Sequence, residues 1–488
     1  MKNRLTLTIA LALVITGCTV GPNFKRPAAP AVNGYTVAPL SATSTETNIP
    51  GGVAQRFVEG EDISGEWWTL FHSQPLNDLI ERSLTNNPNI QSAQAALTVA
   101  RENVLAGKGA YYPQISAGFS ASRNKTSVAI SPTTASGALN YSLFTPDVSV
   151  SYSPDVFGLN RRTVESLQAQ EQAARFQLIA THITLSANVV LAAIQEASLR
   201  AQITATRQLI AVNANLLEVT HEQFAQGAAT HLDVAAQESQ LAQIQAALPP
   251  LLKQLAQQRD LLAALSGGFP SEDLPETFEL SKLQLPAELP VSLPSQLIEQ
   301  RPDVRQAEEN YHVACAQVGV AEANRLPNFT LSADAGTMAL TAGKIFSGGA
   351  GFWDLDASVA QPVFEGGTLL HQQRAAQAAY LEAAEQYRST VVAAFQNVAD
   401  TLNALKQDAD ALKSATAAAN AAKVTLGLSK QKLESGSANV SDLLNAEQTY
   451  QQAEINLVQA QANRYEDTAA LFQALGGGWW NRKDLPQK

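Results

Sequence analysis

The sequence predicts a mainly α-helical chain with a membrane β-barrel portion, built from two internal repeats. Three observations predict this fold class: two long tracts without proline, landmarks that occur twice in the same order, and two pairs of alternating strands. The chain has 488 residues, of which 45% are hydrophobic and only 6% aromatic. Together these features indicate an elongated protein rather than a compact globular domain.

The N-terminus has the parts of an export signal. A positive start with Lys2 and Arg4 precedes a short apolar run at residues 5–15, followed by small residues before Cys18. The run is about half of the roughly 20 residues that a membrane-spanning helix needs. The stretch ITGC resembles a bacterial lipobox, so residues 1–17 are predicted to be a signal peptide. Cys18 is then predicted to carry N-acyl (palmitate) and S-diacylglycerol lipid.

The residue after the cysteine indicates the destination. Thr19, rather than aspartate, follows Cys18, which resembles the outer-membrane address of enteric-type lipoproteins. Residues 18–65 are then a lipidated N-terminal segment. The alternative is an ordinary cleaved signal whose cysteine follows the cut by chance.

The composition argues against several other classes of protein. The net charge is −11, from 33 basic and 44 acidic residues, and no basic cluster supports nucleic-acid binding. Cys315 lies in the apolar-periodic stretch YHVACAQVGVAEA and is expected to be a small buried side chain. No run of 18 consecutive apolar residues follows the signal, so no transmembrane helix is predicted.

The proline-free tracts predict long helices. No proline occurs between Asp155 and Leu248 or between Val363 and Leu485, and good helix formers dominate both tracts. A run from 367 to 435 would be a helix on the order of 100 Å long. Apolar residues at 241, 244, 248, 251 and 255 form a coiled-coil seam. Because prolines at 249 and 250 interrupt that seam, a kink or break is expected there.

Self-comparison reveals two copies of one plan. Pro88 and Pro113 match Pro302 and Pro327 at an offset of 214 positions. Later landmarks match at shorter offsets: Pro154 with 362, and Gly227, Asp233 and Glu238 with 436, 442 and 447. The first copy therefore contains six extra residues between its strand-opening proline and its next landmark. A surface loop at 123–146 is the expected place for them.

Alternating patterns at the period of a strand occur twice in each copy. The apolar positions of these patterns are Ile115, Ala117, Phe119 and Ala121; Val148, Val150 and Tyr152; Phe329, Leu331 and Ala333; and Trp353, Leu355, Ala357 and Val359. Each pair is separated by a loop rich in small polar residues. The first copy is thus predicted to have a strand pair within 113–157 and the second within 327–364.

Aromatic residues gather near the ends of these strands, as in the interfacial girdles of transmembrane barrels. They are Tyr111, Tyr112, Phe157, Phe352, Trp353 and Phe364. Two soluble hairpins would also fit the strand pattern alone. In lipid, however, a β-structure must close, because open edges leave backbone groups unpaired. Four strands cannot close, so two or three chains must combine their strands.

Several short motifs occur in a fixed order and partly in duplicate. They are EWWTLFHSQPLNDLIERSLTNNPNIQSAQAAL, YYPQIS and RLPNFT, PDVFGLNRR and PVFEGGTLLHQQ, QGAATHLDV and ESGSANVSDLL, and the terminal LFQALGGGW. Together they resemble the TolC-like outer membrane efflux protein family, from Cys18 to about Trp480. The lipobox with GCTVGPNFKRP resembles its lipoprotein branch, which is partnered with resistance-nodulation-division pumps.

The resemblance implies a homotrimer in the cell outer membrane, in contact with outer-membrane lipid. Four strands per chain would form a 12-stranded barrel that continues into a long α-helical barrel in the periplasm. Each repeat would contain one short helix, one strand pair and one long helical hairpin. The implied segments are repeat 1 at 66–270, a linker at 271–294, repeat 2 at 295–480 and a tail at 481–488.

The resemblance places the two hairpin turns, at Gly227 and Gly436, at the periplasmic tip. Glycine at a helix C′ position suits a positive φ. Asp233 and Asp442 follow in the first turns of the returning helices, where the helix dipole alone would favour a carboxylate. In three copies, Asp442 would ring a narrow aperture and act as an iris-like gate with cation selectivity.

The second turn departs from the pattern of the protein-secreting branch. Members of that branch can have a second acid three residues later and an arginine two residues after the glycine. This sequence has Asn445 and Ala438 at those positions. Asn445 shares a helix face with Asp442, so the ring would carry less charge and an arginine–aspartate lock is not expected.

The implied function is the exit duct of a tripartite efflux pump, which passively conducts drugs or toxic compounds and so contributes to antibiotic resistance. Its partners would be a periplasmic adaptor and an inner-membrane resistance-nodulation-division pump. No enzyme fingerprint occurs, so no catalytic residue, metal or cofactor is expected beyond the lipid on Cys18. The alternative is a periplasmic adaptor lipoprotein, which would normally have a single hairpin.

Overall fold

The computed structural model describes residues 19–125, 140–272, 274–435, 437 and 440–486. Cys18 and Gly436, two predicted site residues, lie outside this part of the chain. The chain divides into two compact units, which are described separately. Unit 1 comprises Met1–Pro27, Leu97–Ala174 and Ala307–Tyr387, and unit 2 comprises Ala28–Ala96, Arg175–Gln306 and Arg388–Lys488.

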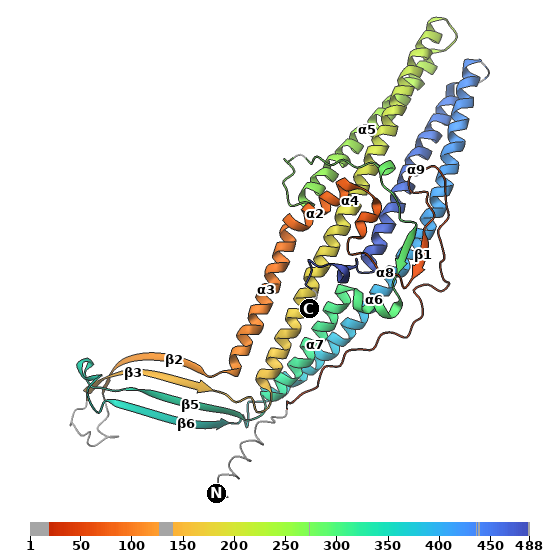
Figure 1. Cartoon of the computed structure of the whole chain (residues 1–488). Helices are drawn as coiled ribbons and strands as arrows, with labels where there is room; N and C mark the ends of the chain where they lie inside the picture. The colour runs from red at the N-terminus through yellow and green to blue at the C-terminus, as the bar shows by residue number, and fades with distance from the viewer. Residues whose placement is uncertain (1–18, 126–139, 273, 436, 438–439, 487–488) are drawn as a thin grey trace. The chain divides into compact units, whose positions relative to one another are not determined.

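The chain is mainly helical, and one order of elements occurs twice (Figure 1). The helices are α2 (Gln74–Asn86), α3 (Pro88–Lys108), α4 (Leu159–Ala225), α5 (His231–Leu265), α6 (Pro294–Gln300), α7 (Pro302–Ala323), α8 (Thr368–Glu434) and α9 (Val440–Ala474). The strands are β1 (Arg56–Glu59), β2 (Gln114–Lys125), β3 (Asn140–Tyr152), β4 (Glu288–Val291), β5 (Asn328–Thr337) and β6 (Gly351–Ala360).

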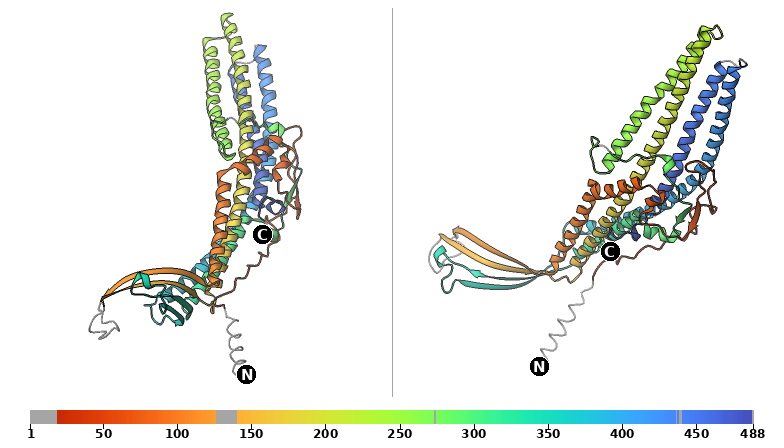
Figure 2. Two further views of the ribbon diagram at one scale, coloured as in Figure 1. Left: turned by 60° about the vertical axis from the view of Figure 1, so that its left-hand side comes forward. Right: turned by 45° about the horizontal axis from the view of Figure 1, so that its top comes forward.

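The long helices match in length between the two copies. α4 and α8 have 67 residues each, and α5 and α9 have 35 each. The first residues of α4 and α8 are 209 positions apart in the sequence, and so are the first residues of α5 and α9. In unit 2, α4 runs beside α5 and α8 beside α9 as antiparallel hairpins (Figure 2). A helix of 67 residues is about 100 Å long, as the proline-free tracts predict.

The α5 helix continues through Pro249 and Pro250, so the predicted break does not occur. A proline removes one backbone donor and crowds the carbonyl four residues earlier. Packing against α4 holds the helix together beyond this point. Gln258 Nε2 donates to Ala192 O of α4 at 3.0 Å, and Leu262 is buried.

Two helices precede each strand pair, rather than the single short helix that was predicted. α2 and α3 have 13 and 21 residues, and α6 and α7 have 7 and 22. Each pair is divided immediately before a proline, because a residue in that position avoids the helical region. Asn87 and Arg301 accordingly have ψ of 124° and 119°.

Unit 1 contains one four-stranded antiparallel sheet in the order β2-β3-β5-β6. β2 and β3 pair along their full length, with Gln114 opposite Ser151 and Lys125 opposite Asn140. The centre of the sheet joins the two copies, because β3 pairs with β5. β2 and β6 are therefore the edges of the sheet.

The six extra residues of the first copy lie within the predicted interval 123–146, but most of them belong to strands rather than to a surface loop. β2 and β3 have 12 and 13 residues, whereas β5 and β6 have 10 each. Five of the six extra residues therefore lengthen the strands. Added residues can extend a regular ladder because each pair of them adds further backbone hydrogen bonds.

Unit 2 has an aromatic core beside its helices. Trp67 stacks on Phe472 of α9 at 5.3 Å, and the Tyr465 hydroxyl donates to Leu283 O at 2.9 Å. A short parallel pair, β1 with β4, also belongs to this unit. The sequence predicts only a linker at 271–294, where β4 lies, so the pairing of β1 with β4 was not predicted.

One helix among the described residues, α4, is long and apolar enough to cross a membrane by length and composition. Of its most apolar stretch, 61% is buried inside the structure. The core helix of a soluble protein passes the same test. Burial by neighbouring elements therefore accounts for the apolar character of α4.

Candidate functional site

The turn after α4 is a helix C-cap centred on Gly227. Gly227 has a φ of +75°, a conformation in which any Cβ would be strained. Its N–H donates to Phe224 O at 3.0 Å, and Ala228 N donates to Gln223 O at 2.8 Å. This is the hydrogen-bond pattern of a Schellman motif. The glycine is therefore required by the backbone of the turn.

Asp233 forms a capping box at the start of α5. Thr230 N donates to Asp233 Oδ2 at 2.8 Å, and Asp233 N donates to Thr230 Oγ1 at 3.3 Å. The hydrogen bond from the Thr230 side chain, followed by the one from its backbone, lowers the pKa of Asp233 below its ordinary value. The structure thus gives Asp233 a capping role that accounts for its position without a gate.

The second turn is described only in part. Gly436 lies outside the described residues, and α9 begins at Val440. Asp442 lies in the first turn of α9 and Asn445 in the next, and both are exposed. Their i, i+3 spacing places them on one helix face. This face bears one carboxylate and one amide, as the sequence indicates.

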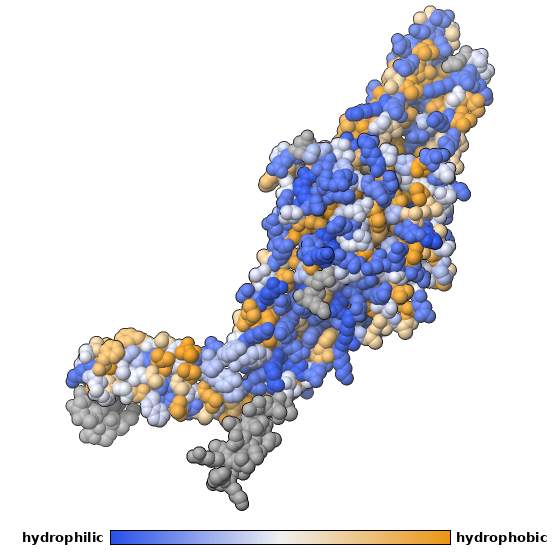
Figure 3. All heavy atoms as spheres, in the orientation of Figure 1, coloured by the Kyte–Doolittle hydropathy of each residue, from blue (hydrophilic) through white to orange (hydrophobic). Residues whose placement is uncertain are grey.

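The sheet of unit 1 has one apolar and one polar face, because side chains alternate along each strand. The large exposed residues of the apolar face are Ile115, Phe119, Val148, Leu331, Trp353, Leu355 and Val359. Figure 3 shows patches of apolar residues among more polar ones on the visible side of these strands. Exposed Tyr111, Tyr112 and Phe364 lie just beyond the strand ends. Such a surface is unfavourable in water and suited to lipid.

The polar face carries four carboxylates, on Asp147, Asp334, Asp354 and Asp356. Asp334 of β5 lies directly opposite Asp354 of β6, and Ser149 of β3 lies opposite Asp334 on the other side. Like charges that face each other across a ladder are destabilising by themselves. An aqueous surrounding reduces this repulsion, so the polar face is expected to be in contact with water.

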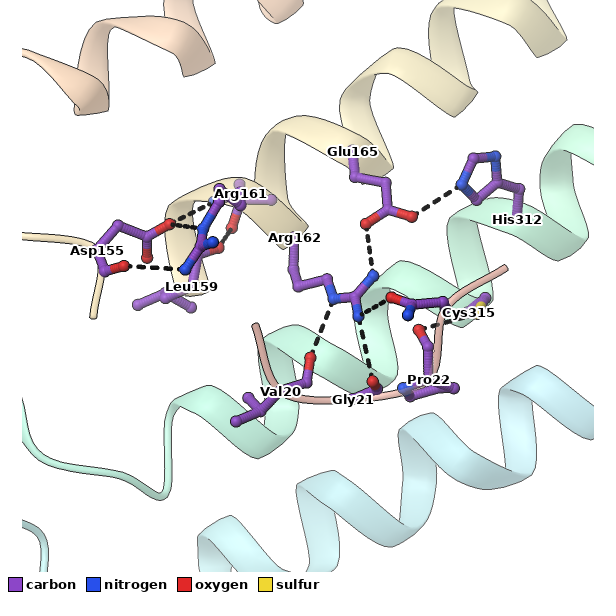
Figure 4. A network of polar contacts seen from close by, with 12 residues as sticks. Val20, Gly21, Pro22, Asp155, Leu159, Arg161, Arg162, Glu165, His312 and Cys315 are labelled. Carbon is purple, nitrogen blue, oxygen red and sulfur yellow. Dashed lines mark hydrogen bonds and ion pairs between the residues drawn. The ribbon is translucent and has the colours of Figure 1, made fainter. Parts of the chain in front are cut away.

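The N-terminal segment is bound to the helices of unit 1 by Arg162 (Figure 4). Arg162 is 2% exposed. Its guanidinium donates to Val20 O at 3.0 Å, to Gly21 O at 3.1 Å and to Asn23 Oδ1 at 2.8 Å. A planar five-donor group suits such a set of carbonyls. The chain directly after Cys18 is therefore held in a defined position.

Glu165 and His312 extend this cluster. Glu165 Oε2 lies 2.7 Å from Arg162 Nη1, and its Oε1 lies 3.0 Å from His312 Nε2. Burial alone would raise the pKa of Glu165, but hydrogen bonds from His312 and Arg162 lower it overall. Hydrogen bonding to Glu309, and then to Glu165, raises the pKa of His312 despite burial.

Two further contacts hold the same segment. His312 stacks on Phe24 with ring centroids 4.3 Å apart. Cys315 is buried, as predicted, and its Sγ donates to Pro22 O at 3.5 Å. A close approach also requires glycine, because a Cβ on Gly21 would lie 2.4 Å from the Cα of Gly319 in α7. The sequence shows Arg162 only as part of the motif PDVFGLNRR, so this role was not predicted.

The chain is similar to outer membrane efflux proteins over most of its length. The family model described as outer membrane efflux protein matches residues 79–268 and 293–477. The toluene efflux pump outer membrane protein TtgF of Pseudomonas putida is 29% identical over 98% of this chain and 98% of its own length. The pyoverdine export outer membrane protein OpmQ of Pseudomonas aeruginosa is 28% identical over 100% of this chain and 99% of its own.

A solved structure has the same fold. The outer-membrane channel OprN superimposes with a TM-score of 0.85 at 25% sequence identity. The superposition covers 95% of this chain and 100% of the OprN chain. The duplicated helices and the four-stranded sheet described above are thus the architecture of a channel-forming protein.

Proposed function

Because the chain belongs to the outer membrane efflux protein family, we propose that three copies of it form the exit duct of a tripartite efflux pump. The duct passively conducts small molecules such as drugs or toxic compounds to the exterior, without a catalytic step and without a metal or cofactor. The observation that carries this proposal is the four-stranded sheet, with one apolar face, one polar face and two open edges.

The open edges support closure by several chains. In lipid, each unpaired backbone group at the edge of β2 or β6 costs several kcal/mol. Three copies arranged head to tail join each β6 to a neighbouring β2 and form a barrel of 12 strands. The apolar face then contacts lipid and the acidic face lines the lumen. The long helices continue as an α-helical barrel in the periplasm.

The relatives indicate a class of cargo rather than a single compound. TtgF is named for toluene efflux and OpmQ for pyoverdine export. The two names therefore give two different cargoes. A wide lumen lined by Ser and Asp side chains suits such a range, because it provides hydration rather than a shaped pocket. The proposed cargo is therefore small molecules that the inner-membrane pump has already selected.

The proposed partners are a periplasmic adaptor and an inner-membrane resistance-nodulation-division pump. Adaptor contacts are assigned to the turns near Gly227 and Gly436, where packing of helical tips between neighbouring hairpins is possible. The alternative that the chain itself is an adaptor is not supported. An adaptor of the single-hairpin type does not account for a duplicated hairpin and a four-stranded sheet.

Electrophoresis and conductance measurements test the proposed duct. Full-length protein from outer-membrane fractions is expected to migrate as a trimer that dissociates on heating. In a planar lipid bilayer it is expected to give stable ion conductance, with β signal in circular dichroism. Recovery of a monomer that neither enters membranes nor conducts ions would contradict the proposal.

Asp442→Ala is expected to raise ion leak or reduce cation selectivity in the same bilayers. Three copies of Asp442 around the tip would repel one another and attract cations, and the substitution removes all three charges. Asn445→Ala, on the same helix face, is the matched control and keeps the charge. Unchanged conductance and selectivity in Asp442→Ala would contradict a gate at this position.

Lipidation of Cys18 is also part of the proposal. Val20 N donates to Phe157 O at 3.1 Å, which holds the first described residues beside the junction of β3 and α4. In a barrel, the strand ends lie at the membrane surface. A lipid attached two residues before Val20 would therefore enter the membrane next to the barrel wall.

Cys18→Ser, combined with a cleavable non-lipid signal, is expected to reach the outer membrane in reduced amount. The barrel itself supplies most of the membrane attachment, and the acyl chains add a second one. Membrane fractionation with immunodetection measures the distribution, and the unchanged chain with its own lipobox is the reference. If the variant is found entirely in the soluble fraction, the lipid rather than the barrel is the anchor.

A further inference from the structure

Glu447 is a carboxylic acid buried between the helical hairpins of unit 2. It lies on α9 and is 1% exposed. Neither of its carboxylate oxygens has an aligned hydrogen-bond partner. A glutamate is almost never fully buried unless it is paired, because removing its charge from water is costly. The position of Glu447 therefore requires an explanation.

Two buried amides from the other hairpin lie at the same place. Asn213 of α4 and Gln237 of α5 are both fully buried. Gln237 Nε2 donates to Asn213 Oδ1 at 3.1 Å, and Asn213 Nδ2 donates to Leu209 O at 3.1 Å. The Asn213 side chain lies against the Glu447 carboxyl. A polar cluster thus connects α9 to both helices of the neighbouring hairpin.

The cluster has acceptors without donors. Gln237 Oε1 and both oxygens of Glu447 lack an aligned donor among the described residues, and only the Asn213 amide approaches the Glu447 carboxyl as a hydrogen-bonding group. Each such buried acceptor destabilises the packed arrangement. A proton on Glu447 changes one of its acceptor oxygens into a hydroxyl donor, and this hydroxyl supplies a hydrogen-bond donor that the cluster lacks. An ionised Glu447 supplies no donor to these acceptors and places a negative charge in the buried cluster, where Lys430 and Asn213 offset only part of the cost of burial.

We propose that Glu447 is a proton-operated latch between the two hairpins of each chain. When it is protonated, its hydroxyl joins the buried amides and α9 stays packed against α4 and α5. When it is ionised, the carboxylate is stabilised by water, and the packing of α9 against the other hairpin loosens. The chain would then respond to pH by a change in the spacing of its own hairpins.

The surrounding charges are consistent with this behaviour. Burial raises the pKa of Glu447 to about 7, although Lys430 and then Asn213 act in the opposite direction. Lys430 faces Glu447 from α8. The groups of α4 and α5 in the cluster, Asn213 and Gln237, are neutral. The proton equilibrium of the latch therefore lies near neutral pH.

The first repeat contains the equivalent pair of positions, and both side chains are exposed within the single chain. Glu238 and His221 lie 209 positions before Glu447 and Lys430. The Glu238 side chain is 57% exposed, and its Oε1 lies 3.8 Å from His221 Nε2. Glu238 thus has the same chemistry and the same place in its hairpin, but no burial within the chain. It is the matched control for a substitution of Glu447.

The direction of the pH response follows from the raised pKa. Below about pH 4.5, Glu447 is protonated in both arrangements, and its contribution to packing is complete. Between about 4.5 and about 7, only the loosened arrangement ionises, so the ratio of loosened to packed chains rises about tenfold per pH unit. Above about 7 both arrangements are ionised and the ratio stays constant.

A distance measurement between the hairpins tests the latch. Spin labels are placed on Gln243→Cys of α5 and Gln452→Cys of α9, two exposed repeat-equivalent positions. The protein is full length, with Cys315→Ala to remove the buried thiol, and labelled chains are diluted with unlabelled ones. Pulsed electron paramagnetic resonance then gives the distance distribution at pH 5, 6, 7 and 8.

The wild-type distribution is expected to shift to longer distances as the pH rises from 5 to 7. Glu447→Gln, which cannot ionise, is expected to keep the short distance at every pH, and Glu238→Gln is expected to behave like wild type. If Glu447→Gln does not assemble, Glu447→Met carries the same expectation. A wild-type distance without pH dependence, or an equal shift in the Glu447 variants, would overturn the latch. Because the readout is a distance, a failed latch leaves the proposed conduction unaffected.

Discussion

Arg464→Met is expected to lower the free energy of unfolding by about 3–5 kcal/mol. Arg464 lies on α9 in unit 2 and is only 1% exposed. It is one of the largest side chains that the structure buries completely. Methionine has a similar length but no donors, so the substitution removes the hydrogen bonds while it keeps most of the volume.

The expected loss follows from the acceptors that Arg464 satisfies. Its guanidinium donates to Leu405 O at 2.9 Å, to Thr43 Oγ1 and Val53 O at 3.3 Å, and to Gly51 O at 3.4 Å. Three of these acceptors belong to the segment at 43–53, which arginine thus holds against α9. Carbonyls left buried without a donor each cost about 1–3 kcal/mol. The segment is therefore expected to detach before the helices unfold.

Thermal unfolding in detergent and limited proteolysis measure both effects. The midpoint of unfolding is expected to fall, and glutamyl endopeptidase is expected to cut at Glu46 under native conditions. Arg464→Lys, which keeps the charge but not the fork of donors, is expected to be intermediate. Arg207→Met, on an exposed part of α4, is the matched control. An unchanged midpoint together with a protected Glu46 would contradict the assigned role of Arg464.

Arg162→Met is expected to release the N-terminal segment from unit 1. The substitution removes three hydrogen bonds to Val20, Gly21 and Asn23 and the ion pair with Glu165. Hydrogen bonds to a charged group contribute about 1.5–3 kcal/mol each. The stacking of Phe24 on His312 remains but is not expected to hold the segment alone.

Tryptic cleavage after Lys25 measures this release. A protease needs several residues of mobile backbone around its site, so the rate of cleavage is expected to rise about tenfold or more. Arg161→Met is a close control, because the neighbouring Arg161 pairs with Asp155 at 3.1 Å. Equal cleavage rates in wild type and Arg162→Met would show that other contacts hold the segment.

The long helices and the strands could be predicted because their signals are local. The tract from 367 to 435 lacks proline and is rich in good helix formers, and α8 begins and ends within one residue of these predicted limits. Alternation of apolar residues marks all four strands of the sheet, and Gly227 has the positive φ that its turn requires. Each of these features depends on neighbours in sequence, which a single sequence displays.

The missed features depend on contacts between distant residues. The parallel pair of β1 and β4 joins 56–59 to 288–291, and neither four-residue stretch has a recognisable pattern alone. Glu238 and Glu447 are equivalent by repeat, yet one is exposed and the other buried. Their difference arises because only Glu447 is covered by the other repeat. Likewise, packing along α4 overrides the local preference of Pro249 and Pro250 to end a helix.

The unequal strand lengths have a consequence for the outer rim of the proposed barrel. A strand of 13 residues spans about 43 Å, and one of 10 residues about 33 Å. The hairpin of the first copy therefore reaches up to about 10 Å further than that of the second. A trimer would present three tall and three short hairpins in alternation to the exterior. The outer rim would then have threefold symmetry, although the three chains together contribute six nearly equivalent repeats. A molecule that docks on the rim from outside would therefore meet three equivalent sites rather than six.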